Sequence, residues 1–124
     1  MYKLGRTSTM RLQGVNPDLV AVVRKAITLT TQDFTVLEGV RSSDRQRELV
    51  ATGKSTTMNS RHLTGHAVDL APYPIDWDWE KFYPIADAMF EAAEGLGVDL
   101  EWGGHWKKFP DGPHFQLSWR SYPL

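Results

Sequence analysis

An aspartate inside an apolar segment is the feature that most restricts how this chain can fold. Asp69 lies between Val68 and Leu70 in the segment HAVDLAP, residues 66–72. The alternation predicts a strand with Val68 and Leu70 on one face and with Ala67 and Asp69 on the other. A carboxylate beside a core is costly unless a cation or hydrogen-bond donors meet it. The rest of the fold must therefore bring such partners to this strand.

Three helical segments surround this strand along the chain. They are expected over about residues 17–29, about 44–52, and in EKFYPIADAMFEAAEGLG at 80–97. The first has Asn16 as N-cap and Pro17 at the first helical position, and Ser43 begins a capping-box spacing for the second. The third has Pro84 in its first turn and ends before Gly97. Each segment has the length of an ordinary globular helix.

Three further short segments are expected as strands. They are FTVLEGV at 34–40, VDLEW at 98–102 and HFQLSW at 114–119, and a Gly- and Pro-rich loop at 103–113 separates the last two. With 41% hydrophobic and 23% charged residues, and no repeat or linker, the chain is expected to fold around one core. We predict an α+β fold, with helices around an antiparallel sheet in a single domain over residues 1–124.

Two histidines and the buried aspartate are placed to hold a metal ion. His62 and Asp69 lie on either side of Gly65, which can let the backbone turn until both side chains reach one point. His114 begins the segment HFQLSW, and its strand could lie beside the one that carries Asp69. Two imidazoles and one carboxylate leave a fourth position open, as in catalytic zinc sites. Residue His66 is expected on the opposite strand face from Asp69, at the surface or behind the ligands.

A metal-bound water needs a base, and two acidic residues compete for that role. Asp111 precedes His114 across a Gly-Pro turn, which can hold it beside the metal without ligating it. Glu101 ends a predicted strand and is the second choice. Asp111 also has an ordinary structural explanation, because Asp-Gly-Pro is a common turn sequence.

Other residues are expected to shape a cleft around these groups. Arg41 lies just before a helix start, where it could grip a substrate carboxylate or an oxyanion. Trp102 and Trp106 flank a glycine pair near the predicted site and could form the cleft wall. His105 is expected at the rim of the cleft and not on the metal.

Several functions are disfavoured by composition. The chain has no cysteine, which excludes disulfides and thiolate ligands, so a metal must be held by His, Asp or Glu. The net charge of −1 offers no basic surface for nucleic acid, which argues against a metal-dependent nuclease. Residues 1–19 have no continuous apolar run, so neither a secretory signal nor stable membrane association is expected.

Two motifs resemble those of a known family. SRHLTGHAVDL at 60–70 matches the pattern SxHxxGxAxDL, and DGPHFQL at 111–117 matches DxPHFxL. Both patterns are typical of the zinc peptidases that comprise D-alanyl-D-alanine carboxypeptidases and L-alanyl-D-glutamate endopeptidases. The segments GVNPDLVAVVRKA, GVRSSDRQ and WGGHW also occur in the order found in that family. The resemblance therefore covers most of the chain.

The resemblance implies a fold and a role for each matching residue. It implies the hedgehog/D,D-peptidase fold, with a small antiparallel sheet, and zinc as the cofactor. The zinc ligands that it implies are His62, Asp69 and His114. It implies that Asp111 is the catalytic base, that Arg41 and Gln46 orient the substrate or stabilise the transition state, and that Ser60 lines the site. His105 departs from the family pattern, in which an acidic or small polar residue is common.

Short members of this family with the same opening resemble phage endolysins. This implies cleavage of the L-alanyl-D-glutamate bond in peptidoglycan stem peptides during host lysis, by a monomer without a separate cell-wall-binding domain. It also implies that the enzyme stays in the host cytoplasm until a holin-type lesion releases it to the periplasm and cell wall. Two alternatives remain: a D-Ala-D-Ala carboxypeptidase of the same fold and a non-catalytic, metal-containing binding module.

Overall fold

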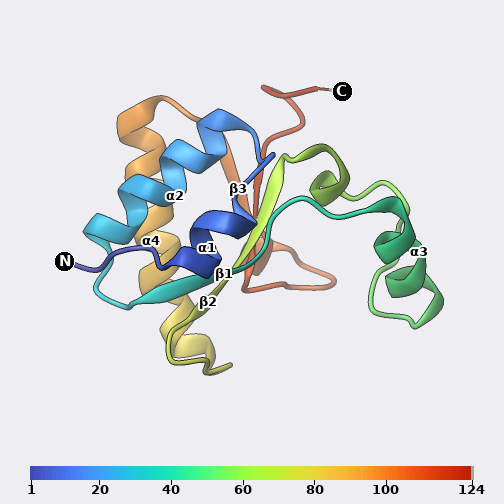
Figure 1. Cartoon of the computed structure of the whole chain (residues 1–124), viewed down its shortest axis with the longest axis horizontal. Coiled ribbons are helices and arrows are strands. Elements are labelled where there is room, and N and C mark those ends of the chain that lie inside the picture. Colours follow the sequence, from blue (N-terminus) through green and yellow to red (C-terminus); the bar gives the residue numbers. More distant parts are fainter. Residues whose placement is uncertain (124) are drawn as a thin grey trace.

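Four short strands form one antiparallel sheet in the computed structural model, which describes residues 1–123 (Figure 1). They are β1 (Phe34–Glu38), β2 (Ala67–Pro72), β3 (Leu100–Trp102) and β4 (His114–Leu117). Their order in the sheet is β1-β2-β4-β3, so β2 and β4 are the central pair. Their register sets Asp69 directly opposite His114. The α+β class predicted from the sequence is confirmed.

Two long helices cover one face of this sheet. α2 (Pro17–Leu29) and α4 (Trp79–Leu96) pack against each other and against the strands (Figure 1). Val68 and Leu70 of β2 and Phe115 of β4 are fully buried in the shared core. Full burial of such a side chain contributes about 1.5–3 kcal/mol, so this alternation sets which strand face turns inward. Asp69 therefore lies on the face away from α2 and α4.

The ends of the helices follow their capping residues. As predicted, α2 begins at Pro17, and the Asn16 side chain accepts a hydrogen bond from the Asp18 amide. α3 (Ser43–Ala51) begins one residue earlier than predicted, because Ser42 and not Ser43 is its N-cap. Ser42 accepts from the Arg45 amide at 3.0 Å. Two 3₁₀ helices, η1 (Arg61–Thr64) and η2 (Gly103–His105), lie in segments expected to be loops.

The longest helix also differs in one detail from its prediction. Asp78 caps α4 by accepting from the Glu80 amide, so the helix begins at Trp79 and Pro84 falls in its second turn, not its first. Gly97 ends α4 in the left-handed conformation, as expected. Within residues 1–123, no helix combines the length and apolar character needed to cross a membrane.

A short helix missed by the sequence analysis protects one edge of the sheet. α1 (Arg6–Arg11) lies against the edge strand β1. The Val36 amide donates to Ser8 Oγ at 2.9 Å, and Arg11 donates to the Val36 carbonyl at 3.0 Å. An edge strand otherwise leaves such groups unpaired. The segment RTSTMR has no apolar periodicity, so the sequence held no signal for this helix.

Replacing the side chain that pairs the edge strand should destabilise the fold. We expect Ser8→Ala to lower the free energy of unfolding by about 1–3 kcal/mol, because the buried Val36 amide loses its acceptor. Urea unfolding followed by circular dichroism measures this loss. Thr9→Ala is the matched control, since the Thr9 hydroxyl bonds only within its own exposed helix. Equal effects of the two substitutions would contradict the role assigned to Ser8.

Candidate metal centre and active-site cleft

The sheet face opposite α2 and α4 carries a polar cleft. Asp69, His114 and Gln116 line it from the central strands, and Glu101 lines it from β3. Residues from the end of α3 to η1 and from the loop before β4 form the surrounding walls. The cleft is therefore built on the polar face of the sheet, against segments that carry most of the predicted site residues.

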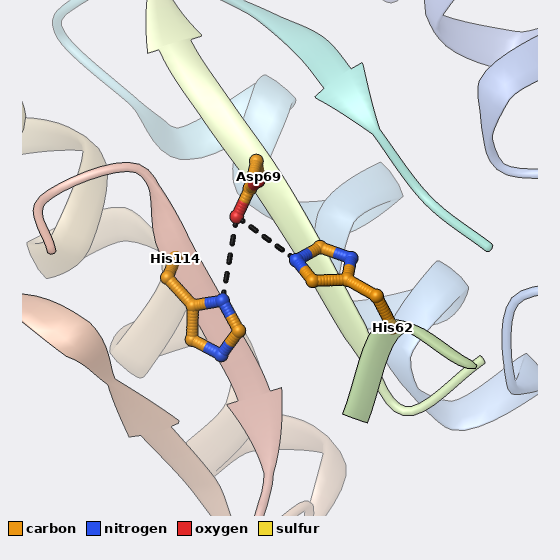
Figure 2. A group of neighbouring side chains, drawn as sticks. All are labelled: His62, Asp69 and His114. Atoms are coloured by element: carbon orange, nitrogen blue, oxygen red, sulfur yellow. Dashed lines mark hydrogen bonds and ion pairs between the residues drawn. The ribbon is translucent and has the colours of Figure 1, made fainter. Parts of the chain in front are cut away.

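His62, Asp69 and His114 meet in this cleft, although they come from three different elements (Figure 2). Asp69 Oδ1 is 3.2 Å from His62 Nε2 and 3.3 Å from His114 Nδ1. One potential ligand atom of each residue lies within 4.8 Å of those of the other two. The structure thus brings together all three residues that the sequence selected as metal ligands.

Gly65 and Ser60 place the first histidine. Gly65 has a φ of +76°, the left-handed conformation that ends η1 and turns the chain into β2. The Gly65 carbonyl accepts from the Asn16 amide at 2.8 Å, which fixes the turn against the start of α2. At the other end of η1, Ser60 Oγ accepts from the His62 amide at 3.2 Å. Ser60 therefore both lines the cleft and holds the histidine backbone.

The hydrogen-bond partners of the two imidazoles show that a cation fits between them. His62 Nδ1 is 2.8 Å from the Gly39 carbonyl, and His114 Nε2 is 2.7 Å from Gln116 Oε1. Oxygens of this kind only accept, so these ring nitrogens carry the hydrogens. His62 Nε2 and His114 Nδ1 then direct lone pairs toward the Asp69 carboxylate. Three acceptors without a donor are costly when buried, and a metal ion would satisfy all of them.

The electrostatics of the site favour positive charge at the same point. Burial alone would raise the pKa of Asp69, but hydrogen bonds and charge from His114 and His62 outweigh it and hold that pKa well below its usual value. Burial alone would lower the pKa of His114. Asp69, Gln116 and Asp111 act in the opposite direction and outweigh burial, so the pKa of His114 is raised overall. Without a metal, the site therefore attracts a proton in place of the cation.

Asp111 lies beside this cluster, on the loop that leads into β4. Its amide donates to the Gly103 carbonyl at 2.9 Å, and its own carbonyl accepts from the His114 amide at 3.2 Å. A Cβ at Gly103 would come within 2.4 Å of the Asp111 carbonyl oxygen, so only glycine permits this approach. Burial raises the pKa of Asp111, and the Asp69 charge raises it further. Such a carboxylate accepts a proton more readily than an ordinary one.

Arg41 also lines the cleft and faces the cluster from the end of the β1 segment. Its Nη2 lies 3.7 Å from Asp69 Oδ2. The guanidinium is held from behind, because Nε donates to Glu38 Oε1 at 2.8 Å and Nη1 donates to Gln46 Oε1 at 2.7 Å. Glu38 is a supporting residue that the sequence analysis did not identify. Glu38 lies three residues before Arg41, but this spacing suggests an ion pair only once the position of the Arg41 side chain is known.

Gln46 supports Arg41 and does not contact the cleft. Its side chain is fully buried and is absent from the cleft lining. Its amide nitrogen donates to Ser55 Oγ at 2.8 Å and to the Thr57 carbonyl at 2.5 Å. Gln46 therefore links α3 to the cleft wall, and any effect on substrate would pass through Arg41.

The two tryptophans predicted to form the cleft wall lie in different places. Trp106 is 40% exposed, lines the cleft and has its ring centroid 4.9 Å from that of His114. Trp102 is only 4% exposed and lies in the hydrophobic core instead. Its Nε1 donates to the Gly112 carbonyl at 2.7 Å, so the core accommodates the polar end of the indole. Of these two tryptophans, Trp106 alone lines the cleft.

The remaining histidines lie outside the metal cluster, as expected. His66 Nδ1 is 2.7 Å from Thr64 Oγ1, and its ring lies near that of Tyr122. His105 stacks on Phe90 and borders a small hollow next to the cleft. Neither residue contributes an atom to the three-residue cluster.

Arg61 is a buried supporting residue that sequence reasoning missed. It precedes His62 in η1 and is 3% exposed. Its Nη2 donates to the carbonyls of Leu117, Ser118 and Tyr122, at distances of 2.8–3.2 Å. Its guanidinium also lies 4.0 Å from the Trp119 ring centroid, a cation–π contact. Arg61 thus ties η1 to the segment after β4.

Comparison with known proteins identifies the family. A family model described as phage L-alanyl-D-glutamate peptidase matches residues 1–117. The chain belongs to this family. It is 36% identical over 117 residues to the L-alanyl-D-glutamate peptidase of Escherichia phage T5, covering 89% of this chain and 85% of that protein. The resemblance recognised from the two motifs is therefore confirmed.

Solved structures place the same peptidase family in a wider fold group. The L-Ala D-Glu endopeptidase ChiX of Serratia marcescens superposes with a TM-score of 0.94 at 48% identity, over 98% of this chain and 94% of that one. The LdcB LD-carboxypeptidase covers 94% of this chain and 64% of its own length, with a TM-score of 0.60 at 12% identity. The match to the D,D-dipeptidase VanXYg covers 83% of this chain and 50% of that protein, with a TM-score of 0.53 at 16% identity. These two distant structures share the fold, which confirms the predicted D,D-peptidase-like architecture.

A side chain at Gly65 should disturb both the fold and the metal centre. A Cβ there would lie 2.7 Å from the Gly14 carbonyl oxygen, in addition to the cost of about 1–2 kcal/mol for a left-handed non-glycine residue. We expect Gly65→Ala to lower the free energy of unfolding and to weaken metal binding, because His62 is displaced. Urea unfolding and metal titration measure the two effects.

Gly53→Ala provides the matched control for this substitution. Gly53 has nearly the same φ, +78°, but nothing lies within 4 Å of its added Cβ. It should therefore show only the conformational cost and normal metal affinity. Equal losses in the two variants would show that the close approach of Gly65 to Gly14 has no consequence.

Proposed function

We propose that this protein is a zinc-dependent peptidase that hydrolyses the L-alanyl-D-glutamate bond of peptidoglycan stem peptides. The observation that carries the proposal is the convergence of His62, Asp69 and His114 in an open cleft beside Asp111. The near full-length likeness to the phage T5 peptidase and to ChiX supports the choice of bond. The proposal names both the metal ion and the substrate, because the proposed hydrolysis requires both.

The donor set favours zinc over other common ions. Two imidazole nitrogens and one carboxylate oxygen form a site typical of catalytic zinc, whereas magnesium and calcium prefer oxygen ligands alone. When bound, the zinc ion would lower the pKa of a water molecule and polarise the carbonyl of the scissile amide. The histidine tautomers set by Gly39 and Gln116 leave the required nitrogens free to bind it.

The chain's own residues supply the proton transfers and the stabilisation of charge. Asp111 accepts the proton of the attacking water and passes it to the D-glutamate amine as the carbon–nitrogen bond breaks. Arg41 donates to the oxygen of the attacked carbonyl, where negative charge develops. Glu38 and Gln46 hold that guanidinium in one orientation before substrate arrives, which reduces the reorganisation needed during the reaction.

Substitution of the base and of a ligand should have different consequences. We expect Asp111→Ala to retain zinc and to lose about 10²–10⁴-fold in turnover, because the proton acceptor is removed. His114→Ala should lose both zinc and activity. Zinc content by atomic absorption and hydrolysis of purified stem peptides measure the two properties. Glu94→Ala, on the exposed surface of α4, is the control that should change neither; an active Asp111→Ala protein would remove Asp111 from this role.

The products of digestion distinguish the proposed enzyme from its alternatives. Mass spectrometry of digested peptidoglycan should show new N-terminal D-glutamate, and the activity should vanish with a chelator and return with zinc. Released D-alanine would indicate a D-Ala-D-Ala carboxypeptidase instead. Intact stem peptides in the presence of zinc-loaded protein would indicate a non-catalytic binding module.

The predicted route to the cell wall can be tested by following the lysis of cells. We propose that the enzyme stays in the host cytoplasm until a membrane lesion releases it. Cells that express the chain alone should remain intact and should lyse when the inner membrane is permeabilised. Lysis without permeabilisation would contradict this. The expectations of a monomer and of no nucleic-acid binding also stay predictions, which light scattering and a DNA-binding assay check.

A further inference from the structure

A chain of hydrogen bonds leads from the metal ligand His114 away from the cluster. His114 Nε2 lies 2.7 Å from Gln116 Oε1, and Gln116 Nε2 donates to Glu101 Oε1 at 3.0 Å. The sheet sets this arrangement, because His114 and Gln116 share one face of β4 and Glu101 is the register partner of Gln116 on β3. Gln116 is only 6% exposed, so its amide has little access to water as an alternative hydrogen-bond partner.

Glu101, the last residue in this series of hydrogen bonds, determines the donor and the acceptor in each of them. An ionised carboxylate only accepts hydrogen bonds, so Glu101 requires the NH₂ end of the Gln116 amide to face it. The amide oxygen must then face His114, and His114 Nε2 must carry a hydrogen to donate to that oxygen. His114 Nδ1 is consequently left with its lone pair toward Asp69, where a metal ion would bind.

We propose that Glu101 is a positioning residue that acts through Gln116 to fix which ring nitrogen His114 offers to the metal ion. The inference rests on the proposed function for the metal itself. His62 needs no such device, because its Nδ1 faces the Gly39 backbone carbonyl, which cannot exchange donor for acceptor. A glutamine amide can rotate by half a turn. The His114 tautomer therefore depends on a residue that does not touch it.

This role also gives a function to Glu101, which the sequence analysis considered as an alternative to Asp111 for the catalytic base. Glu101 Oε1 is occupied by Gln116. Without Glu101, the Gln116 amide can turn its NH₂ group toward His114. The histidine would then accept at Nε2 and carry its hydrogen on Nδ1, the atom needed for the metal. Metal binding would have to reverse this arrangement.

Zinc affinity of the Glu101→Leu protein tests the proposal. We expect its zinc dissociation constant, measured by competition with a chelator, to rise about 10–100-fold, as is typical when a partner of a ligating histidine is lost. Turnover should recover at saturating zinc, because the base is intact. Thermal unfolding in EDTA should confirm that the metal-free variant still folds. Glu94→Leu is the control with an equally drastic change on the exposed surface of α4.

An exchange of the two side chains provides a second, independent measurement. In the double variant Glu101→Gln with Gln116→Glu, the new carboxylate at position 116 accepts from His114, and the new amide at position 101 donates to it. Zinc affinity should return close to that of the unaltered protein, whereas Gln116→Leu alone should show the loss. Nitrogen-15 spectra of the zinc-loaded protein should show His114 protonated at Nε2 and metal-bound at Nδ1.

The outcomes separate the proposal from its rivals. Unchanged zinc affinity in Glu101→Leu, or metal bound at His114 Nε2, would overturn it. A fall in turnover that persists at saturating zinc, with normal affinity, would instead make Glu101 the base. Failure of the unaltered, zinc-loaded protein to cleave stem peptides would refute the proposed function, but would leave the affinity measurements able to decide this inference.

Discussion

The antiparallel pairing of β2 with β4 is the constraint on which the rest of the site depends. Its register sets Asp69 opposite His114, while the neighbouring residues Val68 and Phe115 point into the core. A shift of one residue would turn the apolar side chains to the cleft and the proposed metal ligands to the core. Burial of the core side chains therefore also fixes the positions of two of the proposed metal ligands.

Sequence reasoning succeeded where periodicity and turn chemistry act locally. The alternation around Asp69 predicted its strand and face, and Gly65 predicted the turn that presents His62. It failed where the outcome depended on three-dimensional neighbours. Both Trp102 and Trp106 flank the same glycine pair, and only the tertiary structure shows that the Trp102 indole reaches the Gly112 carbonyl inside the core. Gln46 matched a family motif, but its complete burial accompanies hydrogen bonds to the loop that follows α3, which the sequence does not reveal.

The three proposed metal ligands are held in place by different kinds of contact. The His62 imidazole contacts a backbone carbonyl, that of Gly39, and its position follows from the Gly65 turn and the Ser60 cap of η1. His114 relies on the side chains of Gln116 and Glu101. Asp69 relies on both histidines for the stability of its charge. On the β3–β4 side, the proposed metal centre therefore depends on a series of side chains, whereas on the η1 side it depends mainly on backbone geometry.

The contact between α1 and β1 limits how a peptide substrate can approach the sheet. Many proteins bind extended peptides by adding them as an extra strand at an open edge. Here Ser8 and Arg11 already occupy the outward-facing amide and carbonyl of Val36, at the middle of the β1 edge. A peptide substrate therefore cannot be added as a strand at the middle of β1. Recognition of side groups and termini within the cleft would suit the proposed stem peptide, because its mixed chirality makes its backbone a poor partner for a regular strand.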